Sequence, residues 1–194
     1  MEIEYEATFT DIDREDMRKK LISSGAGLIK PDFLQKRVTL DLPEGHEIKG
    51  GWMRVRDEGD KITMSLKIVD GAKIADQKEI CLKVDDFHNA VELLKTMGCK
   101  EKAFQESRRE LWRLAGTEVT IDEWPFLEPY IEVEGPSEAI VKEVSEKLGF
   151  DWKDAKFCAT GTLISEKYSI SEDIVNNKTP RIVFDMENPF INRE

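Results

Sequence analysis

The chain has 194 residues, of which 36% are charged and 40% hydrophobic, and its formal net charge is −11. This length suits one domain with its own core, and the negative charge argues against general binding to nucleic acids or anionic membranes. It contains no apolar run long enough to span a bilayer and no signal-peptide pattern. The three cysteines are scattered without a C-x-x-C pair, so we expect neither a disulfide framework nor a zinc site. This cysteine pattern instead indicates a reduced cytoplasmic setting.

The first seven residues alternate acidic and other side chains. Because successive side chains on a strand point to opposite faces, the three carboxylates of Glu2, Glu4 and Glu6 share one face. Such a row of like charges is merely a solvated face unless cations lie among the carboxylates. The row of carboxylates becomes informative if later strands carry the same alternation with basic residues, because their polar faces could then line one cavity.

Residues 8 to 84 are predicted to form one helix and four strands. An acidic cap at Asp11 or Asp13 predicts a helix that runs to about Ser24. The segments 33–42, 52–56, 61–69 and 77–84 then alternate polar and apolar residues. Their polar faces carry basic as well as acidic side chains. The charged residues on these faces include Arg37, Arg54, Arg56, Lys67, Glu79 and Lys83.

Residues 85 to 168 continue the pattern. Asp85 or Asp86 caps a second predicted helix that ends at Gly98. Residues 102–114 form a long strand whose alternation leaves two registers open. The two alternatives for its polar face are Ser107 with Arg109, or Glu106 with Arg108. Strands 118–122 and 130–134 follow, then helices over 137–148 and 154–167, and their polar faces hold Asp122, Glu132 and Glu134.

About eight strands joined by hairpins or single helices favour an α+β fold with an antiparallel sheet. Only the apolar face can pack against the helices. If the sheet closes, the charged face must line the interior of an eight-stranded antiparallel barrel, with the helices packed outside. An open sheet with one solvated face, in which the charges form cross-strand pairs, fits the alternation equally well.

A charged interior would suit a polyphosphate and a divalent metal. Arginine and lysine side chains bind phosphate oxygens, and carboxylates hold Mg²⁺ or Mn²⁺. The metal could polarise a phosphoryl group or activate a water molecule. The partner expected from these residues is a small molecule that bears a triphosphate.

The strands resemble, in order and spacing, the motifs of the CYTH superfamily, the triphosphate tunnel metalloenzymes. This group includes class IV adenylyl cyclases, thiamine triphosphatases and inorganic tripolyphosphatases. Its first strand reads E-x-E-x-K, and Glu2 and Glu4 stand where the two glutamates are expected. The further similar segments are 35–41, 52–56, 63–67, 78–79, 108–112, 118–122 and 130–134. The similarity covers residues 1 to about 168, and we expect 169–194 to be an extension that packs on the barrel or on a second subunit of a homodimer.

The resemblance implies an eight-stranded tunnel and roles for its charged residues. The phosphate ligands that the resemblance implies are Arg54, Arg56, Lys67 and Arg109, and the alternation of the strands adds Arg37 and Lys83 as expected phosphate ligands. The expected metal ligands are Glu2, Glu4, Glu79, Asp122, Glu132 and Glu134, and the expected catalytic group is Glu2, Glu4 and Glu6.

Four departures from the family pattern leave the activity open: Arg37 stands where an acidic residue is common, Cys81 stands where a second glutamate is common, and two lysines are replaced. Glu6 replaces the lysine of E-x-E-x-K, and Ser107 replaces a lysine two residues before Arg109. We therefore consider three hypotheses: a metal-dependent triphosphatase, a class IV adenylyl cyclase, and a binder of phosphorylated metabolites without turnover.

Overall fold

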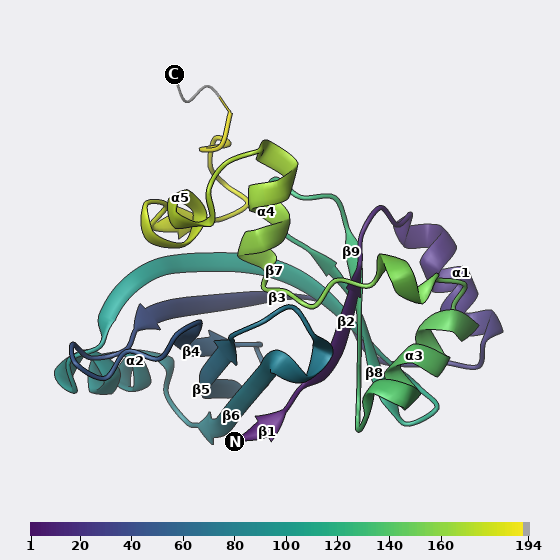
Figure 1. Ribbon diagram of the computed structural model, residues 1–194, viewed down its shortest axis with the longest axis horizontal. Helices are drawn as coiled ribbons and strands as arrows, with labels where there is room; N and C mark the ends of the chain where they lie inside the picture. Colours follow the sequence, from purple (N-terminus) through teal and green to yellow (C-terminus); the bar gives the residue numbers. More distant parts are fainter. Residues whose placement is uncertain (192–194) are drawn as a thin grey trace.

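The computed structural model describes residues 1–191 and shows an α+β fold built on one strongly curved sheet (Figure 1). The strands are β1 (Glu2–Ile3), β2 (Tyr5–Phe9), β3 (Gly27–Asp41), β4 (Gly51–Asp57), β5 (Ile62–Val69), β6 (Gln77–Val84), β7 (Lys100–Leu114), β8 (Thr117–Glu123), β9 (Tyr130–Gly135) and β10 (Arg181–Ile182). The α-helices are α1 (Arg14–Ser23), α2 (Phe87–Thr96), α3 (Glu138–Lys147), α4 (Thr160–Tyr168) and α5 (Glu172–Asn177).

The first strand nearly closes the sheet into a barrel. The sheet runs in the order β1-β6-β5-β4-β3-β7-β8-β9-β2, and its two ends, β1 and β2, are consecutive in the chain. Only Glu4 separates them, and its N–H donates a hydrogen bond to the carbonyl of Gln77 at 2.9 Å. The predicted α+β barrel is thus confirmed. It has nine strands in this path rather than eight because the first strand divides at Glu4.

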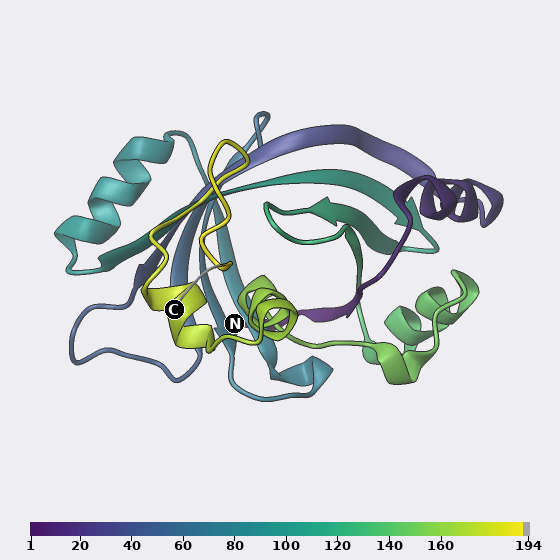
Figure 2. The same cartoon turned by 90° about the horizontal axis from the view of Figure 1, so that it is seen from above.

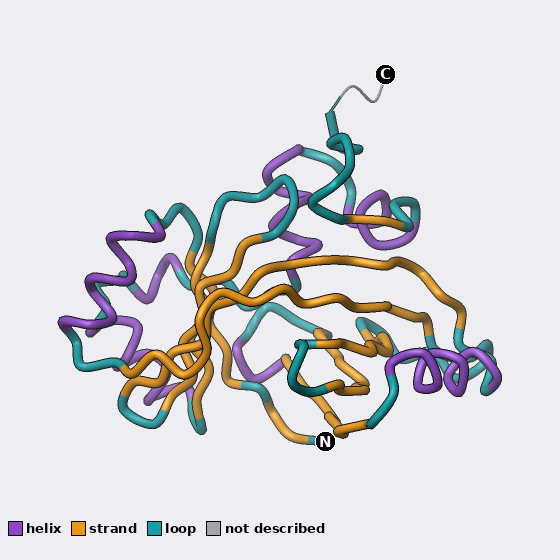
Figure 3. Tube along the Cα trace, turned by 180° about the vertical axis from the view of Figure 1, so that it is seen from behind, coloured by secondary structure: helices purple, strands orange, loops and turns teal. Residues whose placement is uncertain are grey.

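Apolar side chains on the outer face of the barrel pack against helices. Val55, which is 0% exposed, lies in a buried cluster with Leu40 and with Val91 and Leu94 of α2. A second cluster joins strands β2, β7, β8 and β9 to α1 and α3. In Figure 2, α2 lies at one end of the long strands and α1 and α3 at the other. Figure 3 shows the helices around the strands. The charged face therefore turns inward.

The register of β7 settles the alternative that the sequence left open. Ser107 pairs with Gln35, and Arg109 pairs with Asp122. Residues directly opposite each other on antiparallel strands share a face. Ser107 and Arg109 therefore point into the barrel, and Glu106 and Arg108 point away from it.

Side-chain caps begin three of the helices where the sequence predicts them. The caps of α1, α2 and α3 are Asp13, Asp86 and Ser137. Ile22 and Met97, two large apolar side chains at the C-terminal ends of α1 and α2, are more than 60% exposed. The helix expected over 154–167 begins only at residue 160.

The segment after α4 packs into the same structure. Strand β10 pairs with β7 in parallel, a strand that the sequence did not predict. Val175 of α5, Ile182 of β10 and Phe190 share a buried cluster with Ile164 of α4. Residues 192–194, the end of the predicted extension, lie outside the described residues. Within residues 1–191 no helix is long and apolar enough to cross a membrane.

Candidate functional site

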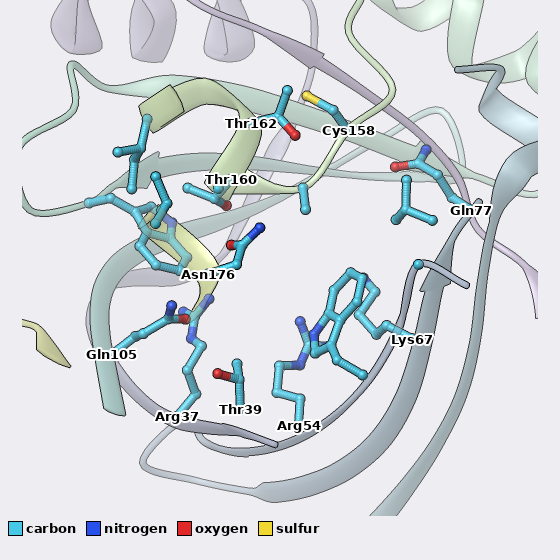
Figure 4. A pocket seen from close by; sticks show the side chains of 18 of the residues that line it. Arg37, Thr39, Arg54, Lys67, Gln77, Gln105, Cys158, Thr160, Thr162 and Asn176 are labelled. Atoms are coloured by element: carbon cyan, nitrogen blue, oxygen red, sulfur yellow. The ribbon is translucent and has the colours of Figure 1, made fainter. Parts of the chain in front are cut away.

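The barrel encloses a cavity of about 550 Å³ (Figure 4). The inner faces of the strands supply one side of its lining, and residues from the loop before α4 to β10 supply the other. Strand alternation explains the first side. Trp52, Arg54 and Arg56 are two residues apart on β4, so all three point inward.

Three basic residues of the lining are each paired with a carboxylate. Arg54 contacts Glu79 at 2.8 Å, and Lys67 contacts Glu4 at 2.9 Å. The guanidinium of Arg56 lies 2.8 Å from Glu58. Burial, reinforced by the positive charge of Arg54, lowers the pKa of Arg56 to about 10. Buried ion pairs of this kind hold the cations in fixed positions.

Arg109 is held by two carboxylates at once. Its Nε and one terminal nitrogen contact Asp122 at 2.7 and 2.9 Å, and the same terminal nitrogen contacts Glu132 at 2.6 Å. Burial alone would lower the pKa of Arg109, but Asp122 and Glu132 outweigh it and raise this pKa well above its usual value. Asp122 is fully buried beneath Arg109, so it orients this side chain from behind.

Arg37 is a buried cation without an acidic partner among residues 1–191. Its guanidinium donates hydrogen bonds to Gln35, at 2.8 Å, and to Ser107, and lies 4.4 Å from the ring centre of Trp124. It is only 6% exposed. Burial, with repulsion from Arg56 and Arg54, lowers its pKa well below the usual value. An uncompensated buried charge is costly, so this position favours an anion.

The acidic wall of the cavity comes from Glu4 and from strands β2 and β9. Glu6 and Glu134 lie directly opposite each other on these strands, and neither forms an ion pair within the described residues. Burial raises the pKa of Glu6 to about 7 despite Lys67, and Glu134 adds to the rise. Burial and the charge of Glu6 raise the pKa of Glu132 to about 8. This wall therefore holds more negative charge than its surroundings neutralise.

The pKa values of Glu4 and Glu79 shift in opposite directions. Burial raises the pKa of Glu4 to about 7, although Lys67 opposes the rise. Burial would also raise the pKa of Glu79, but the hydrogen bond from Glu4 and the charge of Arg54 lower it to about 2.

The donor chemistry of the acidic wall fits Mg²⁺ or Mn²⁺, which prefer oxygen ligands. Within residues 1–191 no three His, Cys, Asp or Glu side chains are already placed to hold a metal ion. Mg²⁺ is commonly bound by one or two carboxylates together with phosphate oxygens and water. The wall thus fits an ion shared with a phosphorylated ligand better than an ion held by protein alone.

Most of the residues predicted for the site line the cavity. They are Glu4, Glu6, Arg37, Arg54, Arg56, Lys67, Glu79, Arg109, Glu132 and Glu134.

Three predicted residues do not line it. Asp122 lies behind Arg109, as described above. Glu2 pairs with Glu79 but is exposed at the end of β1. Lys83 pairs with Thr63 but is exposed where β6 extends past β1. Alternation assigns both residues to the correct face, but it does not specify how far along the barrel they lie.

Several lining or supporting residues escaped the sequence analysis. Glu58 directly follows β4 and continues its alternation, but it lies outside the predicted strand 52–56. Trp124 packs against the guanidinium of Arg37. Thr160 lies in the helix predicted over 154–167 and Asn176 in the segment 169–194, and neither segment was expected at the site. Among these, only Glu58 carried a signal, since it continues the series of even-numbered residues from Trp52.

Comparisons with known proteins agree with this geometry. A family model described as "CYTH domain" matches residues 39–157, whereas no curated protein sequence gives a significant match. A solved structure of a Pyrococcus horikoshii OT3 protein is 22% identical, with a TM-score of 0.67, and the alignment covers 80% of this chain and 96% of that one.

Two further structures are similar. A "putative adenylate cyclase" from Vibrio parahaemolyticus has a TM-score of 0.72 at 10% identity, with 84% of this chain and 98% of that chain covered. A "putative adenylyl cyclase" from Hippeastrum, described as revealing a dominant triphosphatase activity, has a TM-score of 0.54 at 13% identity, with 88% and 97% covered. At these identities the structures establish a shared fold.

The family match itself spans more than half of the chain, from β3 through β9 to the loop before α4. Together with the nearly closed barrel, it shows that this chain belongs to the CYTH domain family.

Proposed function

We propose that the protein is a metal-dependent phosphohydrolase that acts on a triphosphate-bearing substrate inside the barrel. The observation that carries this proposal is a set of three buried arginines on neighbouring strands. Arg37, Arg54 and Arg56 each keep a buried Nε group without a hydrogen-bond partner in the described part of the chain. Buried donors without partners are rare and costly, and phosphate oxygens would satisfy them.

Binding would use the fixed positions of the basic residues. The planar guanidinium forks of Arg54 and Arg56 suit phosphate oxygens in pairs, and Lys67 supplies a compact charge. Arg109 is already oriented by Asp122 and Glu132, so little reorganisation would be needed. Such preorganised cations would hold the phosphates and stabilise the charge that develops during phosphoryl transfer.

Glu4, Glu6, Glu132 and Glu134 would hold one or two divalent ions beside the phosphates. When bound, Mg²⁺ or Mn²⁺ would neutralise phosphate charge and polarise the phosphoryl group. The acidic wall and the basic residues Arg54, Arg56, Lys67 and Arg109 would orient the substrate between them. Water would be the nucleophile, and orthophosphate would be released.

The two alternative functions remain as outcomes of the test. The description of the Hippeastrum protein favours hydrolysis over cyclisation for this chain as well. The position of Glu6, opposite Glu134 in the cavity, favours a binder without turnover, because it adds negative charge where the family pattern has a lysine.

The experiment is product analysis by ³¹P NMR. Tripolyphosphate, thiamine triphosphate and ATP are each incubated with the protein and Mg²⁺ or Mn²⁺, with EDTA as the control. We expect metal-dependent orthophosphate. Cyclic AMP with pyrophosphate from ATP would instead identify a cyclase. No product, in a protein whose melting temperature polyphosphate still raises, would identify a binder.

A further inference from the structure

The sheet has an unpaired edge along the second half of β6. Strand β1 pairs with β6 only at Lys78 and Glu79, whereas β5 pairs with β6 along its whole length. Figure 1 shows β1 and the N-terminus beside β6. Within the described chain, no strand continues β1 along residues 80–84. The barrel is therefore incomplete at this edge.

The backbone of this edge carries hydrogen-bonding groups that no other described strand uses. Residues two apart on a strand direct their N–H and C=O groups to the same side. The carbonyl of Gln77 faces β1, since it accepts a hydrogen bond from the N–H of Glu4. The backbone groups of Cys81 and Lys83 therefore face outward, and those of Leu82 face β5. An edge of this kind is a template for another strand.

The side chains of this edge are exposed and, on the outer face of the sheet, apolar. Ile80 and Leu82 lie on that face, opposite residues of β5, and they are 44% and 54% exposed. Neither belongs to the buried cluster beneath α2. Natural proteins usually cover or charge such an edge, so an apolar one indicates a surface for strand pairing.

Two exposed charges of opposite sign mark the ends of the edge. Glu2 on β1 lies opposite Glu79. Lys83 lies four residues beyond Glu79 on β6, so the side chains of Glu2 and Lys83 point to the same face. Neither lines the cavity, and neither forms an ion pair within residues 1–191. The edge thus has a negative end, an apolar middle and a positive end.

We propose that the edge residues 80–84 pair with the same residues of a second copy of this chain, antiparallel about a two-fold axis at Leu82. Cys81 of each copy then lies opposite Lys83 of the other, and these two pairs exchange four backbone hydrogen bonds. The two Leu82 side chains meet on the outer face, with Ile80 of each copy diagonal to them. This inference goes beyond the proposed function and does not depend on it.

Only this register satisfies the backbone, the available space and the charges together. A shift by one residue would place outward-facing backbone groups of one copy opposite groups that face β5. A shift by two residues in one direction would place Lys83 where Glu2 of the other copy already pairs with Glu79. A shift by two in the other direction would place two Lys83 side chains opposite each other.

The charges identify a second copy as the partner. In the proposed register, β1 of one copy and β6 of the other lie end to end along one edge. Lys83 is then two positions from Glu2 of the other copy, within reach of an ion pair for a long side chain. The two-fold axis repeats this pair at the opposite end. The edge is therefore complementary to itself.

Analytical ultracentrifugation tests the dimer, in reducing buffer because Cys81 is exposed. The proteins are wild type, Leu82→Glu and Leu93→Glu, a matched control because Leu93 on α2 is 53% exposed. We expect wild type to dimerise reversibly. Leu82→Glu should raise the dissociation constant of the dimer about tenfold or more, because it brings two carboxylates together at the apolar centre. Leu93→Glu should stay within about twofold of wild type. Circular dichroism checks that both variants are folded.

Exchange of the charges tests the ends of the interface. Glu2→Lys and Lys83→Glu should each weaken dimerisation at least about threefold at low salt, because like charges then meet at both ends. An equimolar mixture of the two variants should form a mixed dimer about as tightly as wild type, since each end again joins opposite charges.

Amide hydrogen exchange, followed by NMR, tests the register. The N–H groups of Cys81 and Lys83 should exchange more slowly at high protein concentration than at low concentration. The N–H of Leu82 is directed at β5 and should be protected at both concentrations.

Three results would overturn the proposal. One is a wild-type protein that stays monomeric up to its solubility limit. Another is a dimer that Leu82→Glu and Leu93→Glu affect equally, or that the mixed charge variants fail to restore. The third is exchange at Cys81 and Lys83 that does not change with concentration, which would place the contact between copies elsewhere.

Discussion

Val55 and Arg56 are neighbours on β4, but their side chains belong to different environments. Val55 is in the apolar cluster beneath α2, whereas Arg56 lines the cavity. Substitutions at these two positions should therefore separate folding from binding. The pair tests which face of the sheet encloses the ligand.

Arg56→Ala should weaken polyphosphate binding by about tenfold or more, because a charged hydrogen bond contributes about 1.5–3 kcal/mol. It should cost little stability, since Glu58 keeps Lys61 as a partner at 3.3 Å. Val55→Asp should do the reverse and destabilise the fold by roughly 3–5 kcal/mol, the range for an unpaired buried charge. Urea unfolding and calorimetric titration measure the two effects. Unchanged phosphate affinity in Arg56→Ala would contradict the inward-facing charged lining.

The raised pKa values of Glu4, Glu6 and Glu132 make stability depend on pH. Between pH 4.5 and about 7 to 8 the folded protein keeps protons that the unfolded chain has lost. Unfolding then releases protons, so the free energy of unfolding falls as pH rises through this window. The lowered pKa of Glu79 acts only below pH 4.5 and does not oppose the trend.

In EDTA, the melting temperature should therefore be lower at about pH 8.5 than at about pH 6. Glu6→Gln removes one of the titrating groups and should make this difference smaller. Mg²⁺ should raise the melting temperature at the higher pH, because it binds the deprotonated carboxylates. A melting temperature that rises steadily from pH 6 to 8.5 in EDTA would contradict the crowding of carboxylates on this wall.

At the scale of secondary-structure elements, the C-terminal strand β10 contributes to the stability of the barrel. Ile182 is fully buried between β7 and α4, whereas the adjacent Arg181 is exposed. Ile182→Ala should cost roughly 2–5 kcal/mol of unfolding free energy. Arg181→Ala should change stability by only about 0.5–1 kcal/mol, through its contact with Phe104. Equal effects in denaturant unfolding would show that β10 is not anchored through Ile182.

Strands were predictable from the sequence where alternation is strong, as in β4, β5 and β9. The register of β7 was not, because both of its faces carry charged residues near position 108. Its pairing with β3 and β8 determines the register, and pairing is a property of three-dimensional structure. Strand β10 was missed because two residues carry no periodicity.

The cationic part of the cavity was also predictable, because period-two alternation identifies which side chains share a face. The position of each residue along the barrel was not predictable. Alternation therefore placed Glu2 and Lys83 on the inner face, although both are exposed and lie outside the cavity lining. The part of the lining that comes from residues 158–182 was not predicted as part of the site, because helices α4 and α5 are short and reach the cavity only through tertiary packing.

The whole molecule has a net charge of −11, whereas part of its cavity is lined by the basic residues Arg37, Arg54, Arg56, Lys67 and Arg109. A polyanion in solution is repelled by the surface as a whole, so affinity must come from the buried arginines and lysine. Binding should consequently depend on individual interior cations far more than on exposed ones. This contrast gives the central claim its most direct test.

That test is the dissociation constant for tripolyphosphate, measured with Mg²⁺ by calorimetry on wild type, Arg54→Gln and Arg113→Gln. Arg54 lines the cavity, whereas Arg113 is 60% exposed and pairs with Glu118. We predict that Arg54→Gln weakens binding by about tenfold or more, and that Arg113→Gln stays within about twofold of wild type. Equal affinity in all three proteins, or no binding by wild type, would contradict a triphosphate site inside the barrel.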